Sequence, residues 1–382
     1  MSYTIESYLS VNINETIEKL LKRLSKRLNC FVQLVPENDC CNDIRELIDV
    51  QHRKHDEFTF YDYPIEYQNR TIGILQIGDN TEIEIIKGFQ TLINQLIINH
   101  FKWKSIKSSK IVQVDNIDED LIEKFIKKFE EIRKRPTVDK WSSQEARSNF
   151  KIKVSTYAKR NLPIPFVLLG FPFKSTSDEK VIGHLPDMGE YVCLKRLEDW
   201  CESVKEIYPP GVRFVICSDG RIYCRLLNVE DSIIFQYRHA VVNLLPSNNI
   251  SWVGLDDFLP NEIYNSDAKR EFLDLVYKPS LEETKKNISE NGNLKVVFET
   301  FKQFVKEEKK FASNESDDKE CDCITYKMMQ RNQVYSDFME DLFPTHIRLS
   351  IHSHDSIKKV GINLLGDGDT ATPVTLQFIV KI

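Results

Sequence analysis

Polar side chains gather directly after an apolar run in the middle of the chain. Residues 164–170 read IPFVLLG, and the loop that follows contains Lys174, Ser175, Asp187 and Glu190. The run is too short to cross a bilayer and is rich in β-formers, which predicts a buried strand. Loops at the carboxyl ends of such strands commonly hold ligands, so we expect a site here. An ordinary solvated loop after a core strand is the alternative.

A second apolar run leads into polar residues in the same way. Residues 212–217 predict another buried strand, and Ser218, Asp219, Gly220 and Arg221 follow it directly. Taken alone these four residues could form a plain turn, because Asp-Gly is common in turns. The position of the turn at the end of a buried strand favours a site instead.

An alternating segment near the C-terminus carries an arginine, a serine and a histidine. In residues 347–352 the polar Arg348, Ser350 and His352 alternate with isoleucine and leucine, so in a strand they would share one face. Arginine is permanently charged and histidine titrates near neutrality, so this face could bind an anion and move a proton. An exposed antiparallel strand with a polar outer face is the alternative.

The elements that would position these residues follow from the spacing of apolar side chains. Strands are expected at residues 164–170, 212–217, 232–237, 253–255, 347–352, 359–365 and 375–382. Helices are expected at residues 121–135, 142–159, 194–207, 238–245, 267–276, 281–289, 294–311 and 324–342. This alternation predicts an α/β domain with a mostly parallel central sheet, flanked by helices and closed by a C-terminal β portion.

The first 110 residues have a pattern of their own. Helices at residues 14–28 and 82–103 enclose a strand at 31–36 and a hairpin made by 58–67 and 71–78. This order of elements and the amino-acid sequence of residues 63–75 resemble a reduced GAF-type sensor domain. The resemblance implies a small α+β domain over residues 1–110 that regulates or forms a homodimer, before a main domain at 118–382. A packing extension of the main domain is the alternative.

Composition argues against several classes of function. The 382 residues include 52 basic and 58 acidic side chains, a net charge of −6, so no basic surplus indicates nucleic-acid binding. Nine cysteines in no repeating frame suit free thiols in a reducing compartment better than a disulfide scaffold. We find no secretory signal and no apolar stretch of about 18 residues, so we expect a soluble cytoplasmic protein.

Familiar metal and nucleotide motifs are missing from the sequence. The pairs Cys321-x-Cys323 and His352-x-His354 lack the spacing of a zinc site or of an iron facial triad. A Walker A motif, a G-x-G-x-x-G fingerprint and a G-x-S-x-G elbow are absent as well. We therefore expect no metal site.

Six motifs in their order along the chain resemble the pyoverdine/dityrosine biosynthesis family, which contains the isonitrile synthases and fungal relatives that form formyl-tyrosine. They are FPFKS at 171–175, GHLPDMGE at 183–190, IYPPG at 207–211, SDGR at 218–221, FPTHIRLSIH at 343–352 and KVGI at 359–362. The resemblance covers about residues 120–375. It implies an enzyme that joins the α-amino group of tyrosine or tryptophan to ribulose 5-phosphate and forms an isonitrile. It also implies no metal, no organic cofactor, and an iron/2-oxoglutarate oxygenase acting next on the product.

The charged residues of these motifs suit that chemistry. Condensation of an amine with a ketone, followed by enolisations and eliminations, needs acid–base groups, and the substrate phosphate and carboxylate need cations. The candidates for catalysis are Lys174, Asp219 and His352. The candidates for substrate binding are Ser175, Asp187, Glu190, Ser218, Arg221, Arg331, Arg348, Ser350 and Lys359, and we expect an anion clamp of Lys174, Arg348 and Lys359.

One segment departs from the family pattern. Family members usually carry Thr-Pro-Trp-His near the C-terminus, whereas residues 372–375 read Thr-Pro-Val-Thr. If the missing histidine contributes to the site, this chain has changed its substrate, forms a formamide, or has lost activity. An N-formylating enzyme and a non-catalytic regulatory relative that senses a small molecule are therefore the alternatives to an isonitrile synthase.

Overall fold

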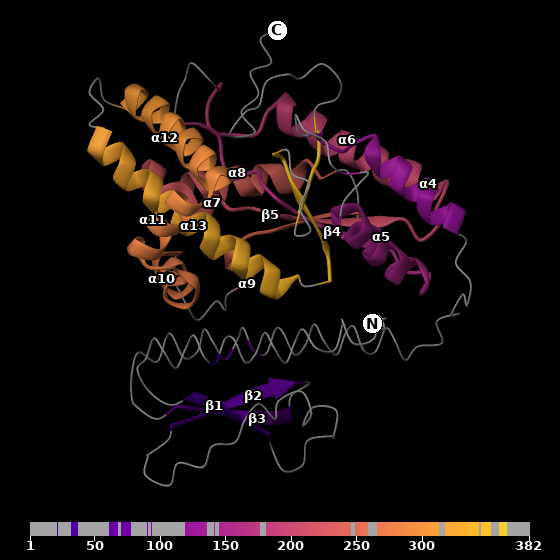
Figure 1. Cartoon of the computed structure of the whole chain (residues 1–382), viewed down its shortest axis with the longest axis horizontal. Helices are drawn as coiled ribbons and strands as arrows, with labels where there is room; N and C mark the ends of the chain where they lie inside the picture. Colours follow the sequence, from indigo (N-terminus) through magenta and orange to yellow (C-terminus); the bar gives the residue numbers. More distant parts are fainter. Residues whose placement is uncertain are drawn as a thin grey trace. The chain divides into compact units, whose positions relative to one another are not determined.

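The computed structural model describes most of the chain after residue 118 and short segments before it (Figure 1). The described residues are 21, 32–36, 61–67, 70–77, 90, 93, 119–135, 141, 145–175, 181–245, 249–258, 266–312, 318–343, 345–352 and 359–364. They belong to two compact units. The first contains Met1–Ile111, Asp256–Lys278 and Val334–Pro344, and the second contains Val112–Leu255, Pro279–Gln333 and Thr345–Ile382.

The first unit contains a three-stranded antiparallel sheet. Its strands are β1 (Val32–Pro36), β2 (Tyr61–Tyr67) and β3 (Arg70–Ile77), in the order β1-β3-β2. The predicted strand and hairpin are confirmed, because β1 is present and β2 and β3 pair in antiparallel orientation. The helices predicted at residues 14–28 and 82–103 lie outside the described residues, apart from single positions. The GAF-type resemblance and the division at residue 110 therefore stay predictions.

The second unit is built on a parallel sheet. Its strands are β4 (Ile164–Leu169), β5 (Val212–Cys217), β6 (Ile250–Val253), β7 (Ile347–Ser350) and β8 (Val360–Gly361), in the order β6-β5-β4-β7-β8. Every pairing between them is parallel, which confirms the predicted α/β class. The chain runs outward from β4 through β5 to β6 and then returns to β7 on the other side of β4. The direction of winding therefore reverses between β4 and β7.

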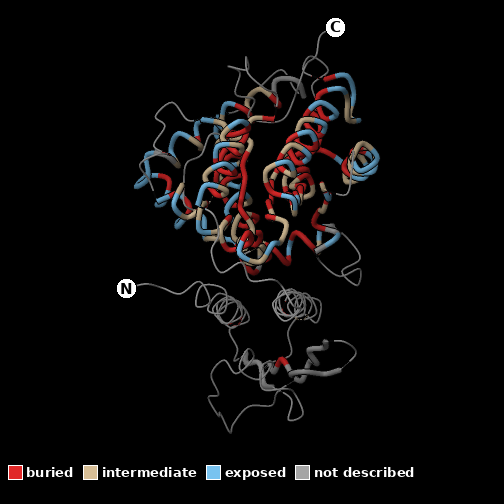
Figure 2. Tube along the Cα trace, turned by 90° about the vertical axis from the view of Figure 1, so that its right-hand side faces the viewer, coloured by how far each residue is buried: buried red, intermediate tan, exposed pale blue. Residues whose placement is uncertain are grey.

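Aromatic side chains form the core on one face of this sheet. The helices α4 (Glu119–Glu130), α5 (Glu145–Ala158) and α6 (Met188–Lys205) lie to one side of the strands in Figure 1. Phe166 of β4 stacks on Phe214 of β5 with ring centroids 5.0 Å apart, and Trp200 of α6 meets both rings edge-on. Burying each large ring contributes roughly 1.5–3 kcal/mol. Figure 2 shows the buried strands lying inside the helices.

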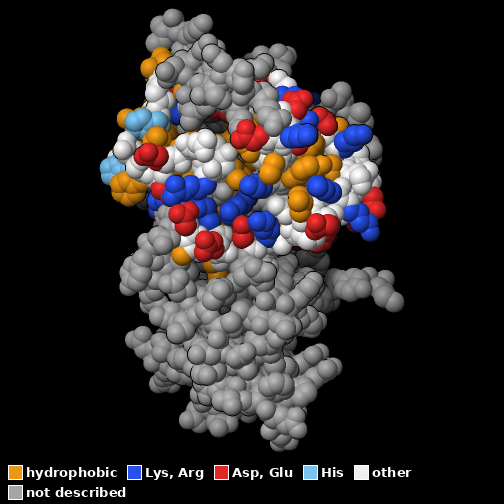
Figure 3. All heavy atoms as spheres, turned by 90° about the vertical axis from the view of Figure 1, so that its left-hand side faces the viewer, with side chains coloured by type: hydrophobic (Ala, Val, Ile, Leu, Met, Phe, Trp, Pro, Cys, Tyr) orange, Lys and Arg blue, Asp and Glu red, His pale blue; other side chains and the backbone are white. Residues whose placement is uncertain are grey.

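Further helices complete the second unit. They are α7 (Gly220–Tyr223), the 3₁₀ helix η2 (Cys224–Leu227), α8 (Asp231–Asn243), α11 (Leu281–Glu290), α12 (Gly292–Ala312) and the first part of α13 (Asp318–Leu342). Ion pairs Lys302–Asp322 and Lys306–Asp318 connect α12 with α13 at 2.5 and 2.7 Å. Basic and acidic side chains are interspersed on the face drawn in Figure 3. Two more helices are α9 (Leu255–Phe258) and, in the first unit, α10 (Ser266–Tyr277).

Two local predictions are wrong. Residues 232–237, expected as a strand, are part of α8, because Ile234, Tyr237 and Val241 recur at helical spacing and are the buried positions. The exposed antiparallel alternative for residues 347–352 is also excluded, since β7 pairs in parallel with β4 and β8 and all four of its residues are buried. The strand predicted at residues 253–255 is displaced, because β6 is Ile250–Val253 and Leu255 already begins α9. Among the described residues, no helix is long and apolar enough to span a membrane.

Candidate active site

The reversal between β4 and β7 places the polar strand ends together. In open α/β sheets, ligands bind in the crevice outside the carboxyl ends of the strands at such a point. Leu169 of β4 pairs with both Cys217 of β5 and Ser350 of β7, so these last strand residues form one row. Because side chains alternate along a strand, Arg348 shares the face of Ser350. The Arg348 and Ser350 side chains of the predicted polar face are thus buried at this end of the sheet, and His352 follows the end of β7.

Two cations lie side by side at this edge. Arg348 is only 7% exposed, and Lys359 directly precedes Val360, the β8 partner of Leu349. Burial, and next the positive charge of Arg348, lower the pKa of Lys359 to about 8. Two neighbouring cations, Arg348 buried and Lys359 partly buried, could bind a multiply charged anion such as a phosphate.

Asp219 provides a carboxyl group at the end of β5. Burial raises its pKa to about 7, and its Oδ1 atom has no hydrogen-bond partner among the described residues. The pKa of the Cys217 thiol is raised by burial and next by the charge of Asp219, while the charge of Arg348 opposes this shift. Asp219 and Arg348 therefore both act on the same strand end. A carboxyl with a pKa near 7 is matched to proton transfer at neutral pH.

The loops after β4 and β5 are joined directly behind Asp219. The hydroxyl of Ser218 donates a hydrogen bond of 3.1 Å to the carbonyl oxygen of Phe171. A Cβ atom added to Gly220 would lie 2.1 Å from the carbonyl oxygen of Pro172, so only glycine permits this approach. Phe171 itself has a φ of 56°, a left-handed conformation that is costly for a phenylalanine. Such strain persists only where the surroundings hold it in place.

His352 and Ser350 complete the end of β7. The backbone N–H of His352 donates to the Ser350 hydroxyl at 3.1 Å. Burial, and next the charges of Lys359 and Lys134, lower the pKa of His352 to about 4. The imidazole is therefore neutral at pH 7 and a weak base. Asp219 is the better matched proton acceptor of the two.

A tyrosine that the sequence analysis did not single out lies beside Asp219. Tyr223 follows one helical turn later, at the end of α7. Burial, and next the negative charge of Asp219, raise the pKa of Tyr223 well above its ordinary value, and the charge of Arg331 on α13 opposes this. Asp219, Tyr223 and Arg331 therefore lie near one another. No sequence motif pointed to Tyr223 or to Cys217. Only their short spacing from Asp219 could have indicated them.

Lys174 belongs to a different cluster. Its Nζ lies 2.7 Å from Glu190 Oε2 and 3.0 Å from Asp187 Oδ2, and its side chain is 1% exposed. Both carboxylates cap α6: the backbone N–H of Asp187 donates to Glu190, and that of Gly189 donates to Asp187. Tyr237 of α8 donates its hydroxyl to Glu190 at 3.1 Å. The predicted residues Lys174, Asp187 and Glu190 thus contact one another.

The charges of this cluster respond differently to burial. Burial raises the pKa of Glu190 above its ordinary value despite the Lys174 ammonium. Burial acts on Asp187 in the same direction, but the backbone N–H of Gly189 and the Lys174 ammonium outweigh it and leave the pKa of Asp187 lowered. Asp187 is therefore ionised at neutral pH and balances the lysine.

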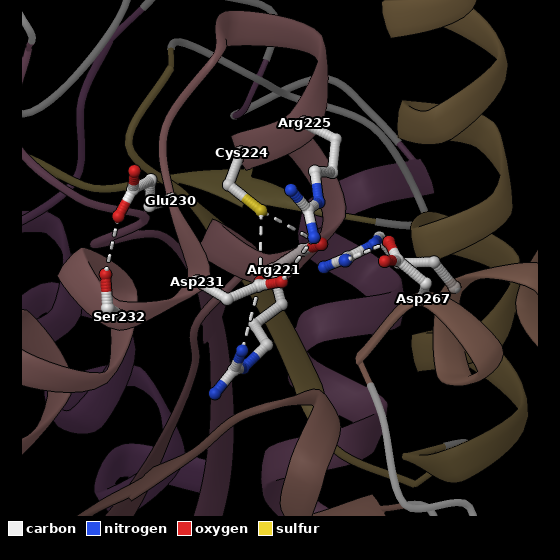
Figure 4. Close-up of polar contacts among 8 residues, drawn as sticks. Arg221, Cys224, Arg225, Glu230, Asp231, Ser232 and Asp267 are labelled. Carbon is white, nitrogen blue, oxygen red and sulfur yellow. Dashed lines mark hydrogen bonds and ion pairs between the residues drawn. The ribbon is translucent and has the colours of Figure 1, made fainter.

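The remaining candidates are paired with side chains of their own unit. Ser175 donates its hydroxyl to the Glu308 carboxylate of α12 at 2.9 and 3.0 Å. Arg221 contacts Asp231 of α8 at 3.0 Å, and Arg225 contacts the same carboxylate at 3.3 Å, so Asp231 lies between the two guanidinium groups (Figure 4). The predicted residues that the structure brings to this end of the sheet are Ser218, Asp219, Arg331, Arg348, Ser350, His352 and Lys359.

Comparison with known proteins identifies the family of the chain. Residues 154–375 match the family model described as pyoverdine/dityrosine biosynthesis protein. The chain belongs to this family. The family resemblance inferred from the six motifs is thereby confirmed. Among the described residues, no group of three or more His, Cys, Asp or Glu side chains could hold a metal ion.

Several family relatives are similar over the same part of the chain. L-tryptophan isonitrile synthase AmbI2 of Fischerella ambigua is 33% identical over 221 residues, covering 56% of this chain and 66% of that protein. L-tyrosine isonitrile synthase of Xenorhabdus nematophila is 29% identical over 228 residues, covering 57% and 68%. Spore wall maturation protein DIT1 of Saccharomyces cerevisiae is 28% identical over 277 residues, covering 63% and 52%. The chain thus spans about two thirds of the length of the two isonitrile synthases.

The fold is also similar to a solved structure. The crystal structure of PvcA from Pseudomonas aeruginosa superposes with a TM-score of 0.58 at 24% identity, over 64% of this chain and 84% of PvcA. The similarity supports the α/β architecture of the second unit.

Proposed function

We propose that the protein is an isonitrile synthase that converts the α-amino group of an amino acid of the tyrosine or tryptophan class, with ribulose 5-phosphate as the one-carbon donor. Family membership and the isonitrile synthases among its relatives support the reaction type. The observation that carries the proposal is that two neighbouring cations, Arg348 and Lys359, lie at the same end of the sheet as Asp219, a carboxyl group with a pKa of about 7. The reaction needs both kinds of group.

Arg348 and Lys359 hold the phosphate of the sugar in this proposal. Arg348 lies on β7 and Lys359 directly precedes the neighbouring β8, and Arg348 presents a fixed fork of donors that matches phosphate oxygens. Arg331 of α13 lies near Asp219 and Tyr223 and suits the carboxylate of the amino acid.

Asp219 acts as the base in the first step. The substrate ammonium gives a proton to the ionised Asp219 carboxylate, and the freed amine attacks the C2 ketone of the sugar. The nitrogen bonds to C2 and passes a proton to the former carbonyl oxygen. Asp219 then returns its proton to the resulting hydroxyl, and the C2–oxygen bond breaks to release water and leave a protonated imine. The enolisations and eliminations that follow require further proton transfers, for which Asp219 has a suitable pKa of about 7. The proposal invokes no metal and no organic cofactor.

The cellular setting is proposed on the same basis. The protein acts in the cytoplasm on small molecules, with neither nucleic acid nor membrane as partner. The first unit regulates it or joins two copies, and an iron/2-oxoglutarate oxygenase takes up the product.

Turnover of labelled substrate tests the proposal. The full chain is incubated with uniformly ¹³C-labelled ribulose 5-phosphate and each of a panel of amino acids, and the products are read by mass spectrometry. A labelled isonitrile is expected with an aromatic amino acid, and Asp219→Asn should abolish it. A labelled formamide would assign N-formylation instead, and no turnover with any amino acid would favour a regulatory relative.

A further inference from the structure

The ammonium of Lys174 is already neutralised inside the protein. Glu190 and Asp187 approach it at 2.7 and 3.0 Å, and the lysine side chain is 1% exposed. Glu190 is in turn held by the Tyr237 hydroxyl and by the backbone N–H of Asp187. A substrate phosphate could reach Lys174 only by displacing the buried Glu190 or the partly exposed Asp187, and the displaced carboxylate would lose its cation, which is unfavourable.

The segment that carries Lys174 is anchored on both sides of it. Ser175 is bound to Glu308 of α12. Phe173 packs in a cluster with Cys224, Val229 and Ile234, which lie around the short helices that follow Asp219. Residues 171–175 therefore form a wall of the site that is held in place by contacts with α6, with α12 and with the chain after β5.

The other end of this wall contacts the residues on either side of Asp219. The Phe171 carbonyl oxygen accepts the hydrogen bond of Ser218, and the Pro172 carbonyl oxygen lies where a Gly220 side chain would be. Asp219 stands between Ser218 and Gly220 in the chain. A shift of residues 171–175 must therefore move Asp219 as well.

We propose that Lys174 is a positioning residue for Asp219: its ion pairs with Glu190 and Asp187 fix residues 171–175, and this segment sets where the Asp219 carboxyl stands. The inference rests on the proposed function, in which Asp219 is the base. It adds that the two lysines Lys174 and Lys359 have different roles. Lys359 binds the substrate anion, whereas Lys174 acts through the protein.

A double-mutant cycle distinguishes the two roles. Lys174→Met leaves Glu190 and Asp187 without their cation, and we expect kcat to fall by about 100-fold, as for a displacement near 1 Å, with the KM for ribulose 5-phosphate nearly unchanged. Adding Glu190→Gln removes the uncompensated carboxylate and should restore part of the lost kcat, a non-additive result typical of contacting residues. Lys359→Met is the matched control, and it should instead raise that KM.

A second measurement does not depend on turnover. Infrared difference spectroscopy follows the titration of the Asp219 carboxyl, with Asp219→Asn identifying its band. We expect its pKa to shift in Lys174→Met and to return toward the wild-type value in the double variant and in Lys174→Arg. If Lys174→Met does not fold, the double variant, which lacks the ion pair, should still show a residual shift that Lys174→Arg, which keeps the charge, does not; equal values in both would overturn the inference.

Three other results would overturn the inference. One is a large rise in the KM for ribulose 5-phosphate in the Lys174 variants. The others are an absence of kcat rescue by Glu190→Gln and an Asp219 pKa that is the same in Lys174→Met as in wild type. Failure of the proposed function would look different, because wild-type protein would then make no isonitrile while the titration still responded to Lys174.

Discussion

The hydroxyl of Ser218 donates a hydrogen bond of 3.1 Å to the carbonyl oxygen of Phe171, and this contact joins the loops after two neighbouring parallel strands. Phe171 accepts it in a left-handed conformation, with a φ of 56°. Asp219 follows Ser218 directly, so the position of the carboxyl depends on a strained residue of the neighbouring loop. Four predictions follow from the way this junction is built and charged.

Substitution of Gly220 tests the junction sterically. A Cβ in Gly220→Ala would lie 2.1 Å from the Pro172 carbonyl oxygen, so the two loops must separate. We expect a loss of stability of about 1–3 kcal/mol, typical of overpacking, together with a large loss of kcat. Urea unfolding and steady-state kinetics measure both.

Gly292→Ala is the matched control, because nothing lies within 4 Å of its added Cβ. This change at the start of α12 should stabilise the protein by up to about 1 kcal/mol and leave kcat unchanged. Equal behaviour of the two variants would contradict the close approach at Gly220.

The acid limb of the pH–rate profile should report Asp219. Its pKa of about 7 predicts that kcat/KM rises as the pH passes through neutrality and the carboxylate forms. His352 has a pKa of about 4 and stays neutral over this range. His352→Asn should therefore keep the limb near pH 7, and a limb that vanishes in this variant would assign the base to His352.

The alkaline limb should report Lys359. Because its pKa is lowered to about 8, the lysine loses its charge as the pH rises above that value, and the KM for ribulose 5-phosphate should increase. Lys359→Arg keeps the charge at all accessible pH values, so the increase should disappear. An unchanged alkaline rise in Lys359→Arg would place the titrating group elsewhere.

Stability should depend on pH through the same carboxyl. Asp219 has a pKa of about 7 when folded and an ordinary value of 3.8, so between these values the folded state binds the extra proton. Stability is then highest at low pH within this window and falls as the pH rises through 7.

Asp219→Asn removes this dependence. At pH 8 the variant should be more stable than wild type by at most about 4 kcal/mol, from about 1.4 kcal/mol per pKa unit, and the difference should shrink toward pH 4. Urea unfolding at pH 5 and pH 8 measures it. A wild-type protein that gains stability over this interval relative to Asp219→Asn would contradict the raised pKa.

Local patterns were sufficient for much of the fold and for part of the site. The apolar runs at residues 164–170 and 212–217 contain the parallel strands β4 and β5, which are mostly buried because Arg213 is their only charged side chain. Alternation in residues 347–352 correctly placed Arg348 and Ser350 on one face. The strand prediction for residues 232–237 was wrong because their β-forming side chains also fit one face of a helix. Packing against the rest of the unit favoured the helix over the strand.

The family, the parallel sheet and the types of residue at the strand ends could be predicted from the amino-acid sequence, since these depend on local order along the chain. The pairing of charges could not, and it became visible only in the folded structure. The folded structure pairs Lys174 with Glu190 and leaves Asp219 Oδ1 without a partner among the described residues. Charge pairing and burial depend on segments distant in sequence, and burial sets the pKa of Asp219 and Lys359. Identical side chains therefore take different roles according to what surrounds them.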